Sequence, residues 1–420
     1  MNMFKKFKKM SVLLALAVVF CFMFAACGNS GGDSPAPSPA PSPAPADGGS
    51  SSDTSSGDQQ LADYDRRGTP VVEGEENAQG AKESPLPVIA PVPAGYEGKT
   101  WDLTCNEQGL DFMAKCKYFR DAFEHISVRT NGQVNITLYT SSTLLPYDSL
   151  LTGVVQGVAD MTSYTADNNA GTQPVTAVFN TIHSAENPDS VTLSKIYREF
   201  LSKHDIFDKE NESKGVVWVS VYALPASTLH FADQGVKEPA GMQGRKTIVD
   251  TTSADYIQSL GSSATVQGIG DYYGSLEKGV VNTLLTHWPL VNDFKLYEVC
   301  KSHLVMSEKS NYAGLQNMLQ GVLMNREVWD SIPPEYQAIM TEELDWAHDV
   351  TSYYDDNVTN NIINTLDAKG SILRPTSDEA AQWFEKTAPS IEKWADYSSA
   401  TGLLTKDEAF ALYDELQKAM

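Results

Sequence analysis

Residues 112–139 read FMAKCKYFRDAFEHISVRTNGQVNITLY, and this stretch decides the fold class. Its apolar side chains recur at steps of four, three, four and three residues, which predicts one buried face of a helix. They are Phe112, Cys116, Phe119, Phe123 and Ile126. Thr130-Asn131-Gly132 ends the helix, because glycine adopts the left-handed conformation that closes many helices. The alternation of Val134, Ile136 and Leu138 then predicts a strand.

The same rhythm of helix and strand continues on both sides of this stretch. Further strands are predicted at residues 101–105, 158–163, 216–222, 246–249, 280–286 and 369–373. Helices are predicted at residues 147–157, from Pro334 to Asp367 and from Ser377 to the end of the chain. Alternating strands and helices indicate an α/β fold with a mainly parallel sheet. The long helix that ends at Asp367 is expected to brace two lobes.

Composition narrows the functions that the chain can have. Its 420 residues suggest two or three units, at about 100–200 residues per domain. Lys and Arg number 31 and Asp and Glu 54, which gives a net charge of −23. An acidic surface repels phosphate groups, so nucleic acid and anionic lipid headgroups are excluded as partners. No apolar run of spanning length follows the first 26 residues, so the body is not a membrane channel.

The first 26 residues predict a signal peptide of the lipoprotein kind. Residues 1–9 are basic and residues 11–26 are apolar. Two alanines precede Cys27, as at the processing site of bacterial lipoproteins, so Cys27 is the expected site of lipidation. An ordinary secreted protein and a retained membrane anchor remain the alternatives. The predicted location is extracytoplasmic, on the bacterial cell membrane and held there by lipid.

Residues 27–97 predict a disordered tether. Residues 34–46 read SPAPSPAPSPAPA, which favours a stiff polyproline-type conformation. Residues 48–60 are rich in Gly, Ser and Asp, and they cannot bury enough apolar surface to fold. A coil of this length reaches roughly 45–50 Å.

The remaining cysteines and histidines predict no cofactor and no metal site. Cys105 and Cys116 could pair outside the cell, but we favour buried thiols for both and for Cys300. No spacing typical of zinc ligands is present. Residues 355–361 read DDNVTNN, but they lack the glycine and the closing glutamate of a calcium loop. We interpret them as exposed helix.

Six segments occur in an order that identifies a family. They are residues 130–139, 144–161, 239–249, 275–281, 294–303 and 325–337. The second contains Val155-Gln156-Gly157-Val158-Ala159-Asp160-Met161. Taken together, these segments resemble the solute-binding proteins of tripartite ATP-independent periplasmic (TRAP) transporters. The resemblance covers about residues 101–420.

The resemblance implies a two-lobed periplasmic-binding-protein fold with crossing strands and a long bracing helix. The first lobe would comprise residues 98–224 and about 314–353, and the second residues 225–313 and about 354–420. A small-molecule ligand would lie between the lobes, which close around it. The partners would be that ligand and the subunits of a TRAP membrane permease.

Ligands of open α/β sheets bind beyond the carboxyl ends of the strands, and this rule nominates contact residues. The candidates are Asn106, Gln108, Ser163, Tyr164, Tyr222, Asp250, Thr251, Thr286, His287 and Trp288. Aromatic rings would supply flat contact, and amides and hydroxyls would orient the ligand. Each candidate could instead be a turn, cap or core residue.

One departure from the family bears on the ligand. Most members hold a ligand carboxylate with an arginine, and alignment on Pro239 and Gly244 places Ile248 at that position. A shifted alignment would offer Arg245 instead. Organic acids are the usual ligands of the family. With Asp250 nearby and Glu107 facing it, a neutral polar or cationic solute becomes the alternative.

Other functions compete with TRAP-type solute binding. The binding protein of an ATP-driven importer would share the two lobes and the cleft. A tethered envelope enzyme is a weaker alternative, because the chain has no Gly-x-Ser-x-Gly, no HExxH and no recognisable Cys/His pair. An adhesive or structural lipoprotein would bind no small molecule at all. We therefore predict no enzymatic activity.

Overall fold

The computed structural model describes residues 89–166, 171–181, 187–250 and 253–420. All of them fall within one compact unit. The predicted signal peptide, the lipidation site Cys27, residues 27–88 of the tether and the candidate Thr251 lie outside the described residues.

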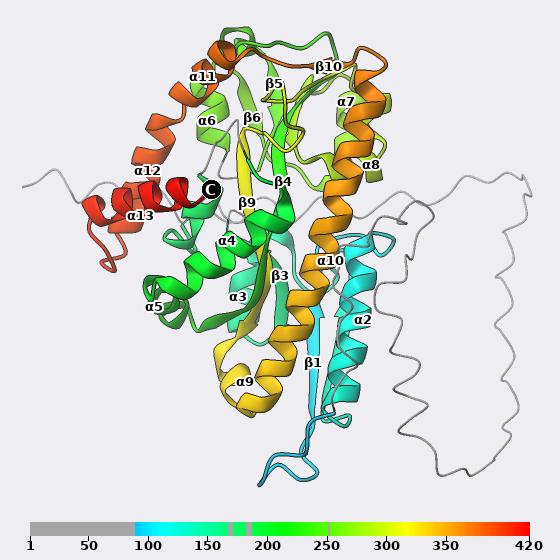
Figure 1. The fold of residues 1–420 in the computed structure, drawn as a ribbon, viewed down its shortest axis with the longest axis vertical. Helices are drawn as coiled ribbons and strands as arrows, with labels where there is room; N and C mark the ends of the chain where they lie inside the picture. Colours follow the sequence, from blue (N-terminus) through cyan, green and yellow to red (C-terminus); the bar gives the residue numbers. More distant parts are fainter. Residues whose placement is uncertain (1–88, 167–170, 182–186, 251–252) are drawn as a thin grey trace, which may run out of the picture. The chain divides into compact units, whose positions relative to one another are not determined.

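The strands and helices follow one another along the chain as in Figure 1. The strands are β1 (Trp101–Asn106), β2 (Val134–Tyr139), β3 (Met161–Thr165), β4 (Val216–Phe231), β5 (Lys246–Ile248), β6 (Ser263–Thr265), β7 (Thr283–Thr286), β8 (Ser302–Leu304), β9 (Gln316–Asn325) and β10 (Ile372–Leu373). The helices are α2 (Ala114–Arg129), α3 (Leu150–Val155), α4 (Ser190–Lys203), α5 (Ile206–Lys214), α6 (Ala254–Ser259), α7 (Tyr272–Glu277), α8 (Trp288–Asp293), α9 (Arg326–Asp330), α10 (Pro334–Asp367), α11 (Ser377–Glu385), α12 (Ala388–Ser399) and α13 (Lys406–Ala419).

The sheet has two parallel halves joined by antiparallel strands. Its order is β2-β1-β3-β9-β4-β7-β5-β6. β1 is parallel to β2 and β3, and β5 is parallel to β6 and β7. β9 is antiparallel to β3 and β4, and β4 is antiparallel to β7. The prediction of a mainly parallel sheet is correct for the two halves and wrong for the strands between them.

Strands β4 and β9 cross from one half to the other. β4 has 16 residues, whereas the sequence predicted a strand only over residues 216–222. Its first part pairs with β9, and its last residues, 228–231, pair with β7. Gly321 lets the crossing strands approach closely, because a Cβ there would lie 2.2 Å from the carbonyl oxygen of Ser220.

Helix α10 has 34 residues and confirms the predicted long helix. Pro334 at its start suits the first turn, where its missing N–H has no helical partner. Figure 1 shows α10 beside α2 at one end and α8 at the other, and it also packs on β4 and α4. The helix therefore contacts elements of both halves.

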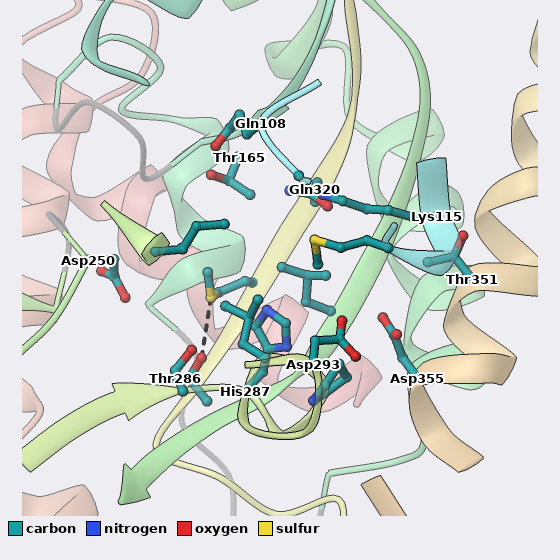
Figure 2. Close-up of a pocket in the computed structure, with 18 of the residues that line it drawn as sticks. Gln108, Lys115, Thr165, Asp250, Thr286, His287, Asp293, Gln320, Thr351 and Asp355 are labelled. Atoms are coloured by element: carbon teal, nitrogen blue, oxygen red, sulfur yellow. Dashed lines mark hydrogen bonds between the residues drawn. The ribbon is translucent and has the colours of Figure 1, made fainter. Parts of the chain in front are cut away.

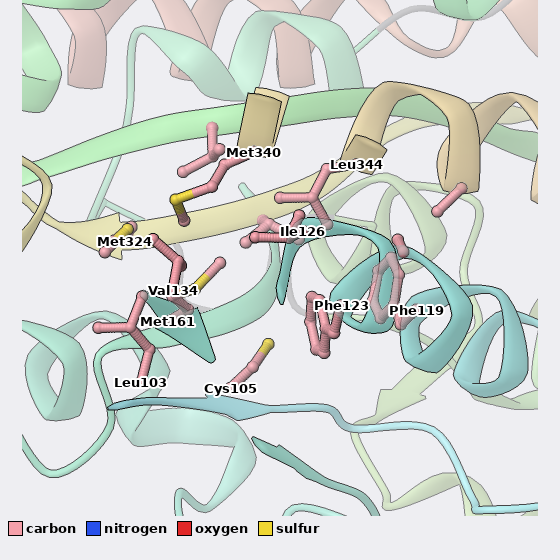
Figure 3. Packing of buried hydrophobic residues seen from close by; sticks show 14 of the residues in the cluster. Leu103, Cys105, Phe119, Phe123, Ile126, Val134, Met161, Met324, Met340 and Leu344 are labelled. Carbon is pink, nitrogen blue, oxygen red and sulfur yellow. The ribbon is translucent and has the colours of Figure 1, made fainter. Parts of the chain in front are cut away.

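Helix α2 buries the face that its sequence predicted. Phe119, Phe123 and Ile126 pack with β1 and α10 residues in the cluster of Figure 3. Gly132 closes the turn after the helix with a φ of 73°. Phe112 is a correction, because it precedes the helix and is 66% exposed.

The C-terminal helices share a core with residues of the predicted first lobe. Trp394 of α12 and Leu412 of α13 pack with Val178, Tyr197 and Phe207. The indole Nε1 of Trp394 donates to the carbonyl oxygen of Pro174 at 2.8 Å. These helices are therefore attached to the part of the chain that carries α4 and α5.

Two details concern the tether and the cysteines. At the end of the predicted tether, the Ala90 amide donates to the Arg129 carbonyl oxygen at 2.9 Å, so this end lies against the body.

Cys105, Cys116 and Cys300 are buried free thiols. Burial raises the pKa of the Cys116 thiol to about 12.

Candidate ligand-binding cavity

A cavity of about 130 Å³ lies where the two halves of the sheet, the crossing strands and α10 meet. Figure 2 shows side chains from all of these elements pointing into it. Its lining residues are Gln108, Gly109, Met113, Ala114, Lys115, Tyr147, Thr165, Tyr222, Leu224, Ser227, Asp250, Ile269, Tyr272, Leu285, Thr286, His287, Pro289, Leu290, Asp293, Met318, Gln320, Thr351, Tyr354 and Asp355. A group bound there would touch both halves at once.

Five of the ten candidates line this cavity. They are Gln108, Tyr222, Asp250, Thr286 and His287. The rule that ligands bind beyond the carboxyl ends of strands explains four of them, because Gln108 follows β1, Asp250 follows β5, Thr286 ends β7 and His287 follows it. Tyr222 lines the cavity for another reason, because it lies within β4 and not beyond its end.

Four other candidates are buried beside the cavity without lining it. Asn106 accepts from the backbone amides of Leu144 and Leu145 at 3.2 and 3.1 Å, so it fixes the loop after β2. The Ser163 carbonyl accepts from the Gln108 side chain at 2.9 Å. The Tyr164 hydroxyl bonds to Thr172 at 2.6 Å. Trp288 packs in the core.

Lys115 of α2 brings a positive charge to the cavity, and a neighbouring carboxylate offsets it. Its Nζ lies 2.6 Å from Oε1 of Glu107, whose side chain is fully buried. Burial disfavours the Lys115 ammonium, but the charge and hydrogen bond of Glu107, together with the nearby Cys116 and Asp355, raise the pKa of Lys115 overall. Glu107 is therefore engaged with Lys115 rather than facing Asp250.

Asp355 of α10 and Asp293 at the end of α8 also reach the cavity (Figure 2). Burial, together with the nearby charges of Asp293 and Asp356, holds the pKa of Asp355 well above its usual range. Burial also raises the pKa of Asp293. The interpretation of residues 355–361 as exposed helix is wrong for Asp355 and Asp356, which are 7% and 6% exposed. Their side chains lie on the inner face of α10.

Asp250 lies at the edge of the cavity, in a network that starts α6. Its Oδ1 accepts from the Ser253 amide at 2.8 Å, and its Oδ2 accepts from the Ser253 hydroxyl at 3.1 Å. That hydroxyl also approaches Oε1 of Gln316 at 2.5 Å. Asp250 therefore links β9 to the loop before α6.

The crossing strands supply an aromatic and amide pair. The Tyr222 hydroxyl donates to Oε1 of Gln320, and the Tyr222 ring stacks on His348 with ring centroids 4.4 Å apart. Both Tyr222 and Gln320 line the cavity. Sequence reasoning missed Gln320, because no strand was predicted over β9.

His287 presents a neutral imidazole to the cavity. Burial lowers its pKa to about 3, and the Lys115 charge acts in the same direction. Its Nδ1 is buried without a hydrogen-bond partner among the described residues. Neutral imidazole can donate or accept one hydrogen bond at that atom, depending on its tautomer.

Ile248 lies away from the cavity. Its side chain is fully buried in a core cluster with Leu284 and Trp288. Arg245, the alternative in a shifted alignment, pairs with Asp233 at 3.0 Å. Of the described residues that line the cavity, Lys115 is the only lysine or arginine.

Two other kinds of feature, metal sites and membrane-spanning helices, are absent among the described residues. Within it, no group of three or more His, Cys, Asp or Glu side chains is arranged to hold a metal ion. None of the helices described is both long and apolar enough to cross a membrane.

The architecture defines a class of protein. Two parallel half-sheets, crossing strands, a long bracing helix and a cavity between the halves are the fold of a two-lobed solute-binding protein. Solved structures share this fold. A TRAP periplasmic solute-binding protein from Desulfovibrio salexigens, with bound orotic acid, matches with a TM-score of 0.64 and 18% identity over 76% of this chain and 100% of that one. DctP7 of Bordetella pertussis, which binds pyroglutamic acid, matches with a TM-score of 0.63 and 17% identity over 75% and 100%.

Sequence comparison names the family. Residues 113–397 match the model of the bacterial extracellular solute-binding protein family 7, so the chain belongs to that family. The ectoine-binding periplasmic protein TeaA of Halomonas elongata is 19% identical over 279 residues, which cover 66% of this chain and 79% of TeaA. The predicted resemblance to TRAP solute-binding proteins and the two-lobed α/β fold are confirmed. Proteins of this family and fold are receptors that bind substrates for transport.

Proposed function

We propose that this chain is a lipid-anchored receptor that captures one small polar solute in the cavity and delivers it to a TRAP membrane permease. The observation that carries the proposal is the lining of the cavity. Gln108 and Lys115 come from one half, Thr286 and His287 from the other, and Tyr222 from a crossing strand. A solute held by all of them favours the closed arrangement over an open one.

We assign the contacts to the predicted residues that line the cavity. Gln108 and Thr286 would orient the solute by hydrogen bonds, and Tyr222 and His287 would supply flat surface. Asn106, Ser163, Tyr164 and Trp288 would instead hold the surrounding loops in place. We propose residues 98–224 with about 314–353 as the first lobe and residues 225–313 as the main part of the second. The sequence assigned residues 354–420 to the second lobe as well, but α12 and α13 pack on residues of the first, so we propose that these two helices move with the first lobe.

Related proteins support a small organic ligand. DctP7 binds pyroglutamic acid, and a similar protein from Roseobacter denitrificans holds β-D-glucuronate. TeaA binds ectoine. We infer that the solute of this chain is of comparable size, and that the protein releases it unchanged.

A thermal-shift screen of the purified protein tests the proposal. Organic acids, amino acids, sugars and polyols would each be added at millimolar concentration. A ligand at 100 times its dissociation constant stabilises the folded state by about 2.7 kcal/mol, which is readily detected. Chromatography of the hit after incubation tests for turnover. Stabilisation with full recovery of the solute supports a receptor, and conversion of the solute would identify an enzyme instead.

The lipid anchor is proposed from the sequence around Cys27. Two alanines before the cysteine and a Pro- and Ser-rich stretch after it are typical of a lipidated N-terminus followed by a tether. Labelling of cells with radioactive palmitate tests this assignment. Incorporation that disappears in Cys27→Ala supports it, and equal labelling of both forms would contradict it.

A further inference from the structure

We propose, on the basis of the receptor function above, that the solute carries a cationic group, such as an ammonium or amidinium, which binds between Asp293 and Asp355. This proposal deepens the proposed function by naming the chemical class of the ligand. It rests on the geometry of the cavity and on the balance of charge within it.

The first observation is that Asp355 has no partner of its own. The residue is 7% exposed and lines the cavity. Its carboxylate makes no hydrogen bond or ion pair with any residue that the structure describes. A buried carboxylate without a partner is costly, and a bound cation removes much of that cost. Its neighbour Asp356 is engaged elsewhere, because its carboxylate accepts from the amides of Ser190 and Val191 at 3.0 and 3.3 Å.

The second observation is that Asp293 faces the same space from another element. Figure 2 shows its carboxylate on the same side of the cavity as that of Asp355, and helices α8 and α10 pack against each other. The two charges interact, since Asp293 is among the causes that raise the pKa of Asp355. The Asp293 carboxylate accepts one long hydrogen bond, 3.4 Å from the side-chain amide of Asn292.

The third observation is that the basic group of the cavity forms its ion pair elsewhere, although its charge still acts on both aspartates. Lys115 is paired with Glu107 at 2.6 Å, so one positive charge meets one buried negative charge. Asp293 and Asp355 then line the cavity without an ion pair to any described basic residue. A ligand that carried only a carboxylate would meet these two groups without a guanidinium to offset them, because Ile248 lies in the core.

The remaining lining fits an organic cation better than a bare metal ion. Tyr272 and Tyr354 line the cavity, and aromatic rings attract organic cations. Leu285, Leu290 and Met318 add apolar surface that would meet the carbon skeleton of such a solute. The Gln108 side chain would hydrogen-bond to an anionic end if the solute were a zwitterion.

Matched pairs of solutes provide the test. The protein would be titrated by thermal shift with L-proline against L-pyroglutamate and with 4-aminobutyrate against butyrate, where each pair differs chiefly in the ammonium group. A metabolite extract of bacterial cells would be added in parallel, and solutes retained after desalting would be identified by mass spectrometry. We expect retained or stabilising solutes to carry a cationic group.

Three variants make the test specific. Asp355→Asn and Asp293→Asn should each weaken binding of the cationic solute at least 10-fold. Asp355→Asn should also raise the melting temperature of the ligand-free protein increasingly as the pH rises, because it removes a carboxyl group whose ionised form burial disfavours. Asp367→Asn, at an exposed position at the end of the same helix, is the control and should change neither quantity.

The outcomes separate this proposal from the receptor function. If carboxylates without a cation are retained and bind equally well to Asp355→Asn, the receptor function stands and the cationic subsite is overturned. Stabilisation by calcium chloride alone, relative to sodium chloride at equal ionic strength, would also overturn it, because the carboxylates would then hold a metal ion. If neither the extract nor any probe yields a bound solute, the receptor function itself fails, and this inference fails with it.

Discussion

Lys115 and Glu107 form an ion pair at the cavity wall, with Nζ 2.6 Å from Oε1 and the Glu107 side chain fully buried. The backbone amide of Gly109 donates to the same oxygen at 2.6 Å. This pair limits the positive charge that a solute meets in the cavity, because the Glu107 carboxylate offsets the charge of the Lys115 ammonium at the cavity wall.

The first prediction concerns this pair. Glu107→Gln keeps an oxygen that accepts from Lys115 and Gly109 but removes the negative charge, so affinity for glucuronate and orotate should rise roughly 10-fold, or about 1.4 kcal/mol. Isothermal titration calorimetry of the parent and the variant measures the two affinities. Glu335→Gln, at an exposed position in the first turn of α10, should leave affinity unchanged. Unchanged or weaker binding of both acids by Glu107→Gln would show that the pair does not control charge in the cavity.

A second prediction concerns the crossing strands. The Tyr222 hydroxyl donates to the Gln320 side chain, and the tyrosine is 1% exposed. Tyr222→Phe should lower the free energy of unfolding by about 1–2 kcal/mol, because it leaves the amide oxygen without that donor. Urea denaturation provides the value. Tyr397→Phe, which alters a 48% exposed ring, should change stability by less than about 0.5 kcal/mol. Equal effects of the two substitutions would count against the hydrogen bond.

The close contact of β4 and β9 gives a third prediction. A Cβ at Gly321 would lie 2.2 Å from the Ser220 carbonyl oxygen and 2.9 Å from Cα of Val221, and both are backbone atoms that cannot rotate away. Gly321→Ala should therefore lower the free energy of unfolding by about 1–3 kcal/mol. Gly268→Ala is the matched control, because a Cβ there meets nothing within 4 Å. A Gly321→Ala protein as stable as its parent would mean that the strands separate at little cost.

The pH dependence of stability gives a fourth prediction. Burial raises the pKa of Asp356 to about 7, although amide hydrogen bonds from Ser190 and Val191 oppose this, and Asp189 adds to the rise. Asp355 and Tyr312 are the other titratable groups near it. The folded state keeps a proton here that the unfolded state loses near pH 4, so this group's contribution to stability falls as pH rises from about 4 to about 7.

Asp356→Asn isolates that contribution. Denaturation curves of the parent and the variant should diverge between pH 4 and pH 7, with the variant gaining relative stability as pH rises. The stability of Asp367→Asn should change with pH in the same way as that of the parent. A constant difference between parent and Asp356→Asn over this range would contradict a raised pKa at Asp356.

The sequence predicted much of the fold because periodic patterns record local structure. The face of α2, the cap at Gly132 and the length of α10 all follow from spacing within one segment. β9 was missed because pairing with β4 defines it, and that partner lies about 100 residues away. The direction of the crossing strands was missed for the same reason.

The cavity was only partly predictable for a related physical reason. Residues that follow strand ends, such as Gln108 and His287, are found by a topological rule that needs no packing information. Asp355 and Asp293 lie on helices, and only the docking of α8 on α10 shows which of their faces is inside. Sequence alone therefore predicts that an acidic run on a helix is exposed, because it contains no information on the packing of α8 against α10.

The claim that a single small solute occupies this cavity has a direct measurement. The protein and an Ala114→Phe variant, in which a ring would fill part of the cavity, would be incubated with bacterial metabolite extract and examined by native mass spectrometry. We predict one small organic molecule per chain in the parent and none in the variant, with both proteins folded as judged by their melting temperatures. Absence of a bound molecule in the parent, or equal retention by Ala114→Phe, would contradict the account.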